Sequence, residues 1–283
     1  MKLLTLNTHS LIEGQGAAQA SVLSEAILCE RFDVIALQEV NQHRDAAALA
    51  ASALRRFTRC SETIPVREGN FAYEVIRLLE RAGAHYHWCY LPVKIGYGRY
   101  DEGLAFLCRA PIASVECACL SLRHDYTDWK TRRMLAVRCE GSEDWFLNLH
   151  LGWWEDPEEP FVAQWVRLIP HLSEKERYWL MGDLNNPAEV RGEGYDLLRD
   201  SGLFDAFERA QMRIGRGTAR AGIDGWHGRE VPCEWLRIDQ IWSSRDARIL
   251  ECRTLFDGER YPRISDHFGV FVRALENCKE KTR

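Results

Sequence analysis

The chain has 283 residues, of which 46% are hydrophobic and 28% are charged, and these proportions exclude a disordered or low-complexity chain. The net charge is −5 at pH 7, so the chain lacks the strongly basic balance of many proteins that bind long nucleic acids. No stretch reaches the roughly 18 apolar residues that a membrane-spanning helix needs. We therefore expect a globular protein without membrane or nucleic-acid attachment, and no feature indicates an obligate protein partner.

The ten cysteines predict free thiols rather than a disulfide framework. Cys29, Cys108 and Cys139 lie inside apolar runs, where a thiol behaves as a small hydrophobic side chain. The sequence contains no Cys-x-x-Cys pair, and its first residues do not resemble a secretory signal. Reduced thiols are typical of proteins in the cytoplasm, and this is the location that we expect.

Taken in chain order, short apolar runs predict strands and longer runs with helical spacing predict helices. The predicted strands cover 2–7, 33–38, 104–108, 112–121, 133–139, 145–150, 178–182, 237–242, 247–255 and 268–274. The predicted helices cover 17–31, the Ala-rich segment 44–56, 70–82 with Asn70 as N-cap and Gly83 after its end, 160–172 and 195–201. Because strands recur without a linker, we expect one α/β (α+β) domain over 1–283. Its two sheets should pack face to face with helices outside.

Five of the apolar strand-like runs end in polar or charged residues. These ends are Asn7, Glu39, His150, Asp183 and the pair Asp266-His267. Charged side chains are almost never buried alone, so such strand ends are expected to meet partners. If they converge, they form one site of carboxylates, amides and imidazoles. Such a site suits a hard divalent cation and phosphate.

Glu39 is the strongest candidate for a metal ligand, because the end of a strand would hold it in place. A solvated glutamate at a turn is the alternative. Asn7 could contact metal or phosphate, or it could cap a turn. Asp183 and Asn185 are two residues apart, so an extended chain points them to the same side. There they could orient a water molecule and hold a phosphate oxygen, although the segment also fits a turn rich in Asp and Asn.

His267 needs a carboxylate other than its neighbour Asp266, because adjacent residues on a strand face opposite ways. Asp239 lies inside an apolar strand and would serve. It would fix the imidazole tautomer and favour the charged ring, which can stabilise negative charge on phosphate. The alternative is that Asp239 is a buried acid paired with Arg237 or another arginine.

Another histidine and two arginines offer further polar groups. His150 ends a strand and is either structural or catalytic, and Glu102 could be its carboxylate partner. Arg132 and Arg133 precede a strand and carry guanidinium groups suited to phosphate.

Together these segments resemble the endonuclease/exonuclease/phosphatase superfamily, the Mg²⁺-dependent group that includes pancreatic-type DNases, inositol polyphosphate 5-phosphatases and sphingomyelinases. The matching residues, in the order of the family, are Asn7, Gln38, Glu39, Glu102, Gly103, Arg133, His150, Gly182, Asp183, Leu184, Asn185, Asp239, Ser265, Asp266 and His267. The resemblance implies a DNase I-like four-layer sandwich of two mixed β-sheets flanked by helices. The site would lie at one edge.

The resemblance also implies roles for the metal-binding end of the site. Glu39 would be the main ligand of Mg²⁺, with Mn²⁺ as a second option, and Asn7 and Asp266 would lie near the metal. Asp183 would position or deprotonate the attacking water, and Asn185 would hold the phosphate. The reaction would be an in-line hydrolysis in which positioning and charge stabilisation do most of the work.

Five residues would act on the phosphate and the substrate in the same family. His267, oriented by Asp239, would stabilise the transition state. His150 and Glu102 would form a second pair of histidine and carboxylate at the phosphate. Arg133 would contact the substrate.

A narrower resemblance is to the bacterial maltose 6′-phosphate phosphatase branch, which dephosphorylates an imported disaccharide phosphate. Its motifs are carried by 95–105, 128–133, 149–154, 193–198, 223–226 and 237–241. The same segments hold aromatic residues that could stack on sugar rings, namely Tyr97, Trp129, Trp153, Trp154 and Trp226. Core packing is the alternative for each of them.

These observations favour one function over two others. The first hypothesis is a Mg²⁺-dependent phosphatase acting on a small phosphorylated sugar, most specifically maltose 6′-phosphate. The second is a nuclease or other phosphodiesterase, which would want a basic track that the acidic segment 153–159 opposes. The third is a binding protein of the same fold without activity, which would have lost site residues that are all present here.

Overall fold

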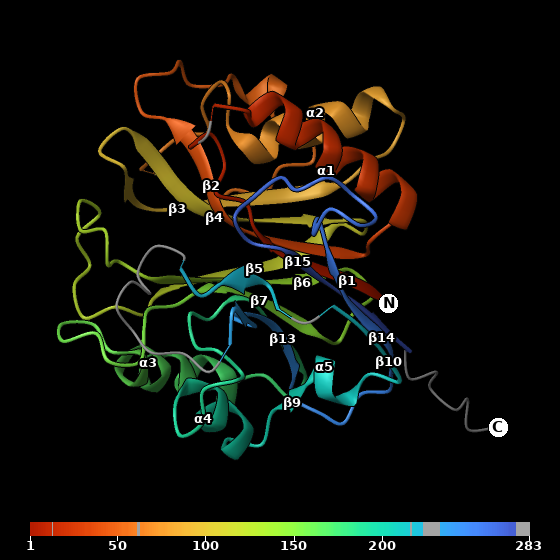
Figure 1. Cartoon of the computed structure of the whole chain (residues 1–283). Helices are drawn as coiled ribbons and strands as arrows, with labels where there is room; N and C mark the ends of the chain where they lie inside the picture. Colours follow the sequence, from red (N-terminus) through yellow and green to blue (C-terminus); the bar gives the residue numbers. More distant parts are fainter. Residues whose placement is uncertain (13, 61–62, 216, 223–232, 276–283) are drawn as a thin grey trace.

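Two β-sheets lie face to face, and helices cover their outer faces, in the computed structural model of the chain (Figure 1). The structure describes residues 1–12, 14–60, 63–215, 217–222 and 233–275. Both sheets are mixed, because parallel pairs such as β1 with β2 occur beside antiparallel ones. The predicted four-layer sandwich of two mixed sheets flanked by helices is therefore confirmed.

Sheet one has seven strands among the described residues. From edge to edge they are β10 (Met212–Ile214), β14 (Ile249–Leu255), β15 (Gly269–Ala274), β1 (Lys2–Asn7), β2 (Val34–His43), β4 (Tyr100–Cys108) and β3 (His87–Gly96). The first and last strands of the chain's described part, β1 and β15, are antiparallel neighbours at its centre.

Sheet two has six strands in the same described ranges. In order they are β5 (Ile112–Cys119), β6 (Arg133–Cys139), β7 (Trp145–His150), β8 (Tyr178–Asp183), β13 (Asp239–Ser243) and β9 (Phe204–Asp205). A separate two-stranded ribbon pairs β11 (Ala219–Arg220) with β12 (Trp235–Leu236).

The helices form the two outer layers. They are α1 (Gly16–Glu30), α2 (Phe71–Arg81), α3 (Phe161–Ser173), α4 (Gly194–Asp200) and α5 (Ala206–Arg209), with one 3₁₀ turn, η1 (Ala51–Ala53). α1 and α2 cover sheet one, whereas α3 and α4 cover sheet two (Figure 1). α2 begins as predicted, because the side chain of Asn70 accepts a hydrogen bond from the Tyr73 backbone N–H at 3.1 Å.

Strand β1 shows why the strands of the sandwich read as almost continuous apolar runs. Leu4 and Leu6 pack against the helices, whereas Leu3 packs between the two sheets. A strand that is buried on both faces needs apolar residues at successive positions, not at alternate ones. The inner face nevertheless carries Asn7 at the end of β1, and this residue is fully buried.

One predicted element is absent from the structure, and one long strand was not expected. The expected helix over 44–56 is wrong, because most of these residues are exposed and only η1 is helical. Only Leu49 and Leu54 of this Ala-rich segment pack against the core, and helix propensity alone does not hold a helix that buries so little. Strand β3 was not predicted, because Pro92 interrupts the pattern. β3 is an edge strand with a register shift between Pro92 and Lys94, and both features accommodate proline.

One edge of the sandwich holds the first residue of the chain, and the opposite edge holds the end of β1. Met1 lies at one edge, marked N in Figure 1, and β1 runs from there towards the opposite edge, where Asn7 ends the strand. None of the helices in the described ranges is long and apolar enough to cross a bilayer.

Candidate active site

A cavity of about 370 Å³ opens at the edge where β1, β7 and β8 end and where β2 carries Glu39. Both sheets contribute to it. Its lining comprises His9, Glu39, Lys94, Ile95, Gly96, Tyr97, Glu102, Trp129, Arg132, His150, Trp153, Asp183, Asn185, Asp266 and His267. Asn7 and Asp239 lie directly behind this lining, because each forms a hydrogen bond to one of its members. The structure therefore brings together most of the residues predicted for the site.

A β-bulge aims Glu39 at the cavity. The pairing of β2 with β4 shifts between Leu37 and Val40, and Glu39 adopts a left-handed backbone conformation with φ of 49°. A bulge of this kind re-aims a side chain that regular pairing would place elsewhere. The hydroxyls of Thr8 and Ser10 each donate to the Glu39 carbonyl at 2.9 Å, so the distorted backbone keeps its hydrogen bonds.

Asn148 fixes the same bulge from the opposite sheet. This fully buried residue of β7 donates through Nδ2 to the carbonyls of Leu37 and Ala105, both at 2.9 Å. Its Oδ1 accepts from Gln38 Nε2 at 2.7 Å. The sequence analysis missed this role, although an amide inside the apolar run before His150 was the available signal. The amide satisfies carbonyls that the bulge would otherwise leave unpaired.

The register of sheet two sets His150, Asp183 and Asp239 in one row. His150 of β7 pairs with Asp183 of β8, and Asp183 pairs with Asp239 of β13. Directly opposite residues share a face of the sheet, so the three side chains point to the same edge of the cavity. Gly182 permits this arrangement, because a Cβ there would lie 1.9 Å from the Leu149 carbonyl oxygen.

The carboxylate of Asp183 is the centre of the site. Asn7 Nδ2 donates to Asp183 Oδ2 at 3.1 Å and to Glu39 Oε1 at 2.9 Å. The Nε2 atoms of His150 and His267 lie 3.7 and 3.8 Å from the same Asp183 oxygen. Burial raises the pKa of Asp183 to about 7, and the nearby Asp239 adds to this rise. Burial and the Glu102 carboxylate also raise the pKa of Glu39.

His267 forms the expected hydrogen bond to Asp239, with 2.8 Å between Nδ1 and Oδ2. The alternative pairing of Asp239 with Arg237 is wrong, because Arg237 binds Asp205 at 2.6 Å. Burial disfavours the charged ring of His267, but the Asp239 and Asp183 carboxylates outweigh burial and hold its pKa well above the usual value. Asp266 also lines the cavity but does not pair with His267; its carboxylate contacts His9 Nδ1 at 3.3 Å.

The expected pair of His150 and Glu102 is not formed. Glu102 of β4 lies opposite Lys94 of β3, and their side chains form an ion pair at 3.2 Å. His150 lies instead near Asp183 and, at 4.0 Å, near Glu39. Burial, with the cations of Arg132 and Lys94, holds the pKa of His150 well below its usual value. The surroundings of His150 therefore favour the neutral ring, whereas those of His267 favour the protonated ring.

Of the two candidate arginines, Arg132 lines the cavity and Arg133 does not. Arg133 Nη1 reaches the Pro92 carbonyl at 3.4 Å. Neighbouring residues of an extended segment face opposite ways, so only one of the two arginines can point into the cavity. Arg132, and not Arg133, is therefore the arginine that lines this cavity. Lys94 and His9, which also line the cavity, were not predicted.

Trp153 and Trp154 are also adjacent residues, and only one of them lies in the cavity. Trp153 lines the cavity and lies beside Trp129, with 5.9 Å between their ring centroids. Trp154 packs against Phe161 in the core beneath α3, so its predicted stacking on a sugar is not supported. Trp226 lies outside the described residues. Tyr97 and Trp129 complete an aromatic rim and are 56% and 53% exposed.

Backbone strain is concentrated at this cavity. Of the eight non-glycine residues with positive φ in the described ranges, four line it, namely His9, Glu39, Tyr97 and Asn185. Such conformations cost free energy and persist only where the surroundings hold them, which is common at functional sites. Asn185 is held through its backbone N–H, which donates to Asp183 Oδ1 at 2.9 Å.

The donor set fits a hard divalent cation. Glu39, Asp183 and Asp266 offer carboxylate oxygens, which are the ligands that Mg²⁺ prefers. Asn7 directs its Nδ2 towards Glu39 and Asp183, whereas its Oδ1 accepts from the His9 backbone N–H at 3.2 Å. Burial raises the pKa values of Glu39 and Asp183, so the positive groups around these carboxylates do not fully stabilise their ionised forms. Ligand atoms of Asp183, Asp239 and His267 also lie within 4.8 Å of one another, although the hydrogen bond to Asp239 occupies Nδ1 of His267. A bound cation would supply Lewis acidity towards a phosphoryl oxygen.

The chain resembles several solved structures over almost its whole length. A family member from Leptotrichia buccalis is 24% identical, with a TM-score of 0.83, and the match covers 98% of this chain and 100% of that one. A mannosyl-6-phosphatase from Bacteroides thetaiotaomicron is 18% identical, with a TM-score of 0.64 and coverage of 98% and 100%. A 3′ phosphatase from Neisseria, bound to a product DNA hairpin, is 17% identical, with a TM-score of 0.62 and coverage of 98% and 100%. At these identities the likeness shows a shared fold.

No curated protein matches the chain. The model of the endonuclease/exonuclease/phosphatase family, in contrast, matches residues 4–267, which include every residue of the site. The chain therefore belongs to the endonuclease/exonuclease/phosphatase family, whose members are hydrolases that depend on divalent metal ions.

Proposed function

We propose that the protein is a metal-dependent phosphatase that removes the phosphate group from a small phosphorylated sugar. Mg²⁺ is the proposed metal, and maltose 6′-phosphate is the most specific candidate substrate. One observation carries the proposal: the same cavity holds the polar cluster around Asp183 and an aromatic rim of Tyr97, Trp129 and Trp153. We further propose that the enzyme works in the cytoplasm and needs no partner protein.

The polar cluster would perform the hydrolysis. Glu39, with Asn7 and Asp266 nearby, would hold the metal ion. Asp183 would position the attacking water and accept its proton, which suits a carboxylate with a pKa of about 7. The protonated ring of His267, held by Asp239, would stabilise the charge that develops on the phosphate.

His150 and Asn185 would contact the phosphate group itself. The His150 ring is neutral and faces Asp183, so one of its nitrogens can donate a hydrogen bond. Asn185 Nδ2 donates to the Leu151 carbonyl at 2.8 Å, which leaves its second hydrogen for a phosphate oxygen.

The aromatic rim supports a sugar as the other part of the substrate. Pyranose rings have apolar C–H faces, and aromatic side chains give them large contact areas at low entropic cost. Trp129 and Trp153 meet at the mouth of the cavity with their ring planes inclined at 55°. The similarity of fold to a mannosyl-6-phosphatase is consistent with this class of substrate.

The experiment that tests the proposal is phosphate release from maltose 6′-phosphate, glucose 6-phosphate and a short DNA duplex, each with Mg²⁺ and with EDTA. Release from the sugar phosphates that EDTA abolishes would support the proposed function. A preference for the disaccharide would support the maltose assignment. Cleavage of DNA instead would show that the site serves a nuclease, and the sugar proposal would be wrong.

A further inference from the structure

Arg132 is a buried cation without an anionic partner. The residue is only 4% exposed, and no carboxylate of the described residues lies within 4.0 Å of its guanidinium group. Its Nε atom is buried without a hydrogen bond, and Nη1 has only a long contact of 3.4 Å with the Trp129 carbonyl. A buried charge that lacks a partner is costly, so the site must provide a reason to keep it.

Lys94 adds a second cation beside Arg132. It is 6% exposed, forms the ion pair with Glu102 and donates to the Trp129 carbonyl at 2.9 Å. Burial lowers the pKa of Lys94, and the positive charge of Arg132 lowers it further. We call Arg132, Lys94 and Glu102 the basic wall of the cavity. Lys94 and Glu102 pair with each other in this wall, so Arg132 is its one charged group without an ion-pair partner among the described residues.

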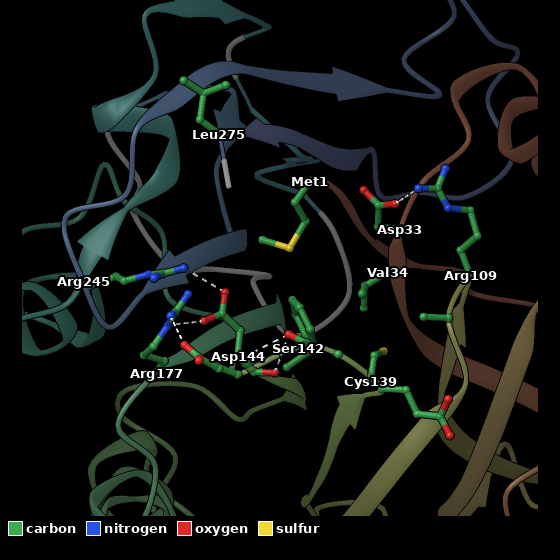
Figure 2. A pocket seen from close by; sticks show the side chains of 15 residues that line it. Met1, Asp33, Val34, Arg109, Cys139, Ser142, Asp144, Arg177, Arg245 and Leu275 are labelled. Carbon is green, nitrogen blue, oxygen red and sulfur yellow. Dashed lines mark hydrogen bonds and ion pairs between the residues drawn. The ribbon is translucent and has the colours of Figure 1, made fainter. Parts of the chain in front are cut away.

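A second cavity in the same protein provides a contrast. It has about 360 Å³ and lies at the opposite edge of the sandwich, beside Met1 (Figure 2). Its arginines are all paired: Arg109 binds Asp33 at 2.5 Å, and Arg177 and Arg245 bind Asp144 at 2.7 and 2.9 Å. These arginines are more exposed than Arg132 and still have carboxylate partners. Each arginine of this distal cavity therefore has a carboxylate partner, whereas Arg132 of the basic wall has none within 4.0 Å among the described residues.

We propose that Arg132, supported by Lys94, binds the terminal oxygens of the substrate phosphate and thereby selects phosphate monoesters over diesters. This inference rests on the proposed function, because it concerns the same cavity. A monoester carries nearly two negative charges above about pH 7, since its second pKa is about 6, whereas a diester carries one. The guanidinium group can donate two parallel hydrogen bonds to phosphate oxygens. The additional charge of a monoester would give Arg132 the ion-pair partner that it lacks within the protein.

The test uses the full-length chain with Mg²⁺ and the variant Arg132→Met, which keeps the length of the side chain and removes its charge. Competitive inhibition by inorganic phosphate, a dianion, is compared with inhibition by dimethyl phosphate, a monoanion. We expect the inhibition constant for phosphate to rise at least about tenfold, because a charge-assisted hydrogen bond is lost. The constant for dimethyl phosphate should change by less than about threefold. Arg132→Lys should restore part of the preference for phosphate.

Two controls separate this role from a structural one. Arg109→Met removes an arginine from the distal cavity and should leave both inhibition constants unchanged. The Tm of Arg132→Met should stay the same or rise, because the substitution removes an unpaired buried charge. If Arg132 only holds the Trp129 carbonyl, the Tm should fall and both inhibitors should weaken equally.

An unchanged constant for phosphate, or equal weakening of both inhibitors, would overturn the inference while leaving the proposed phosphatase intact. A wild-type enzyme that hydrolyses diesters and no monoester would instead overturn the proposed function.

Discussion

Replacement of Asn148 by alanine should damage both the stability of the protein and its metal site. The substitution removes two hydrogen bonds to the carbonyls of Leu37 and Ala105 and one from Gln38. All three groups are buried, and each buried polar group left unsatisfied costs about 1–3 kcal/mol. We therefore expect the free energy of unfolding to fall by about 3–5 kcal/mol. For a chain of this size the Tm should fall by about 10 °C.

The same variant should bind Mg²⁺ more weakly, because the amide holds the bulge that aims Glu39. A displacement of about 1 Å in a catalytic group can cost about 100-fold in rate. Unfolding by urea gives the stability, and calorimetric titration with Mg²⁺ gives the metal affinity. Both should be measured well below the Tm of the variant, so that the folded state is compared.

Asn70→Ala is the matched control, because Asn70 is also a buried amide but caps α2 away from the cavity. It should lose about 1 kcal/mol of stability and keep its metal affinity. If Asn148→Ala loses less than 1 kcal/mol, or binds Mg²⁺ as tightly as the control does, then the amide does not hold the bulge and the reasoning is refuted.

Three further predictions concern the cavity. Glu39→Gln should abolish nearly all metal-dependent turnover and leave the circular dichroism spectrum unchanged; near-normal turnover would show that Glu39 is not a ligand. Trp153→Ala should raise KM for a sugar phosphate more than for p-nitrophenyl phosphate, whereas Trp154→Ala should mainly lower the Tm, because this ring packs in the core. The affinity for Mg²⁺ should rise between about pH 6 and about pH 8, since Asp183, with a pKa of about 7, adds a negative charge beside the metal site when it loses its proton. A flat titration profile would mean that the charge of Asp183 does not act on the metal.

The chemistry of the site was predictable wherever local geometry decides it. The alternation expected of a strand excluded Asp266 as the partner of His267 and left Asp239, an acid on a buried strand. Residues 265–267 form a bend before β15, and Asp239 is nevertheless the partner. The structure forms that hydrogen bond. The same local rule could not choose between Arg132 and Arg133, because the sequence does not show which of two adjacent side chains points towards the cavity.

Features that depend on distant parts of the chain could not be predicted. The pairing of Lys94 with Glu102 follows from the register of β3 and β4, and Pro92 hid β3 altogether. The bulge at Glu39 appears only once β2 pairs with β4. Register is set by long-range packing. Single segments of the sequence therefore do not show that Glu102 pairs with Lys94 rather than with His150.

The origin of the site in both sheets has a consequence for how the protein is made. The Ser265 hydroxyl donates to the Asn7 carbonyl at 2.8 Å across 258 positions of sequence, beside the site. A ribosome releases Asn7 and Glu39 long before it reaches Asp239 and His267, and long-range contacts of this kind also fold slowly. A nascent chain therefore lacks Asp239, Asp266 and His267 until the segments that carry β13 and β15 are made. Activity appears in one step when the last strands join, so recovery of turnover reports complete folding more strictly than recovery of secondary structure does.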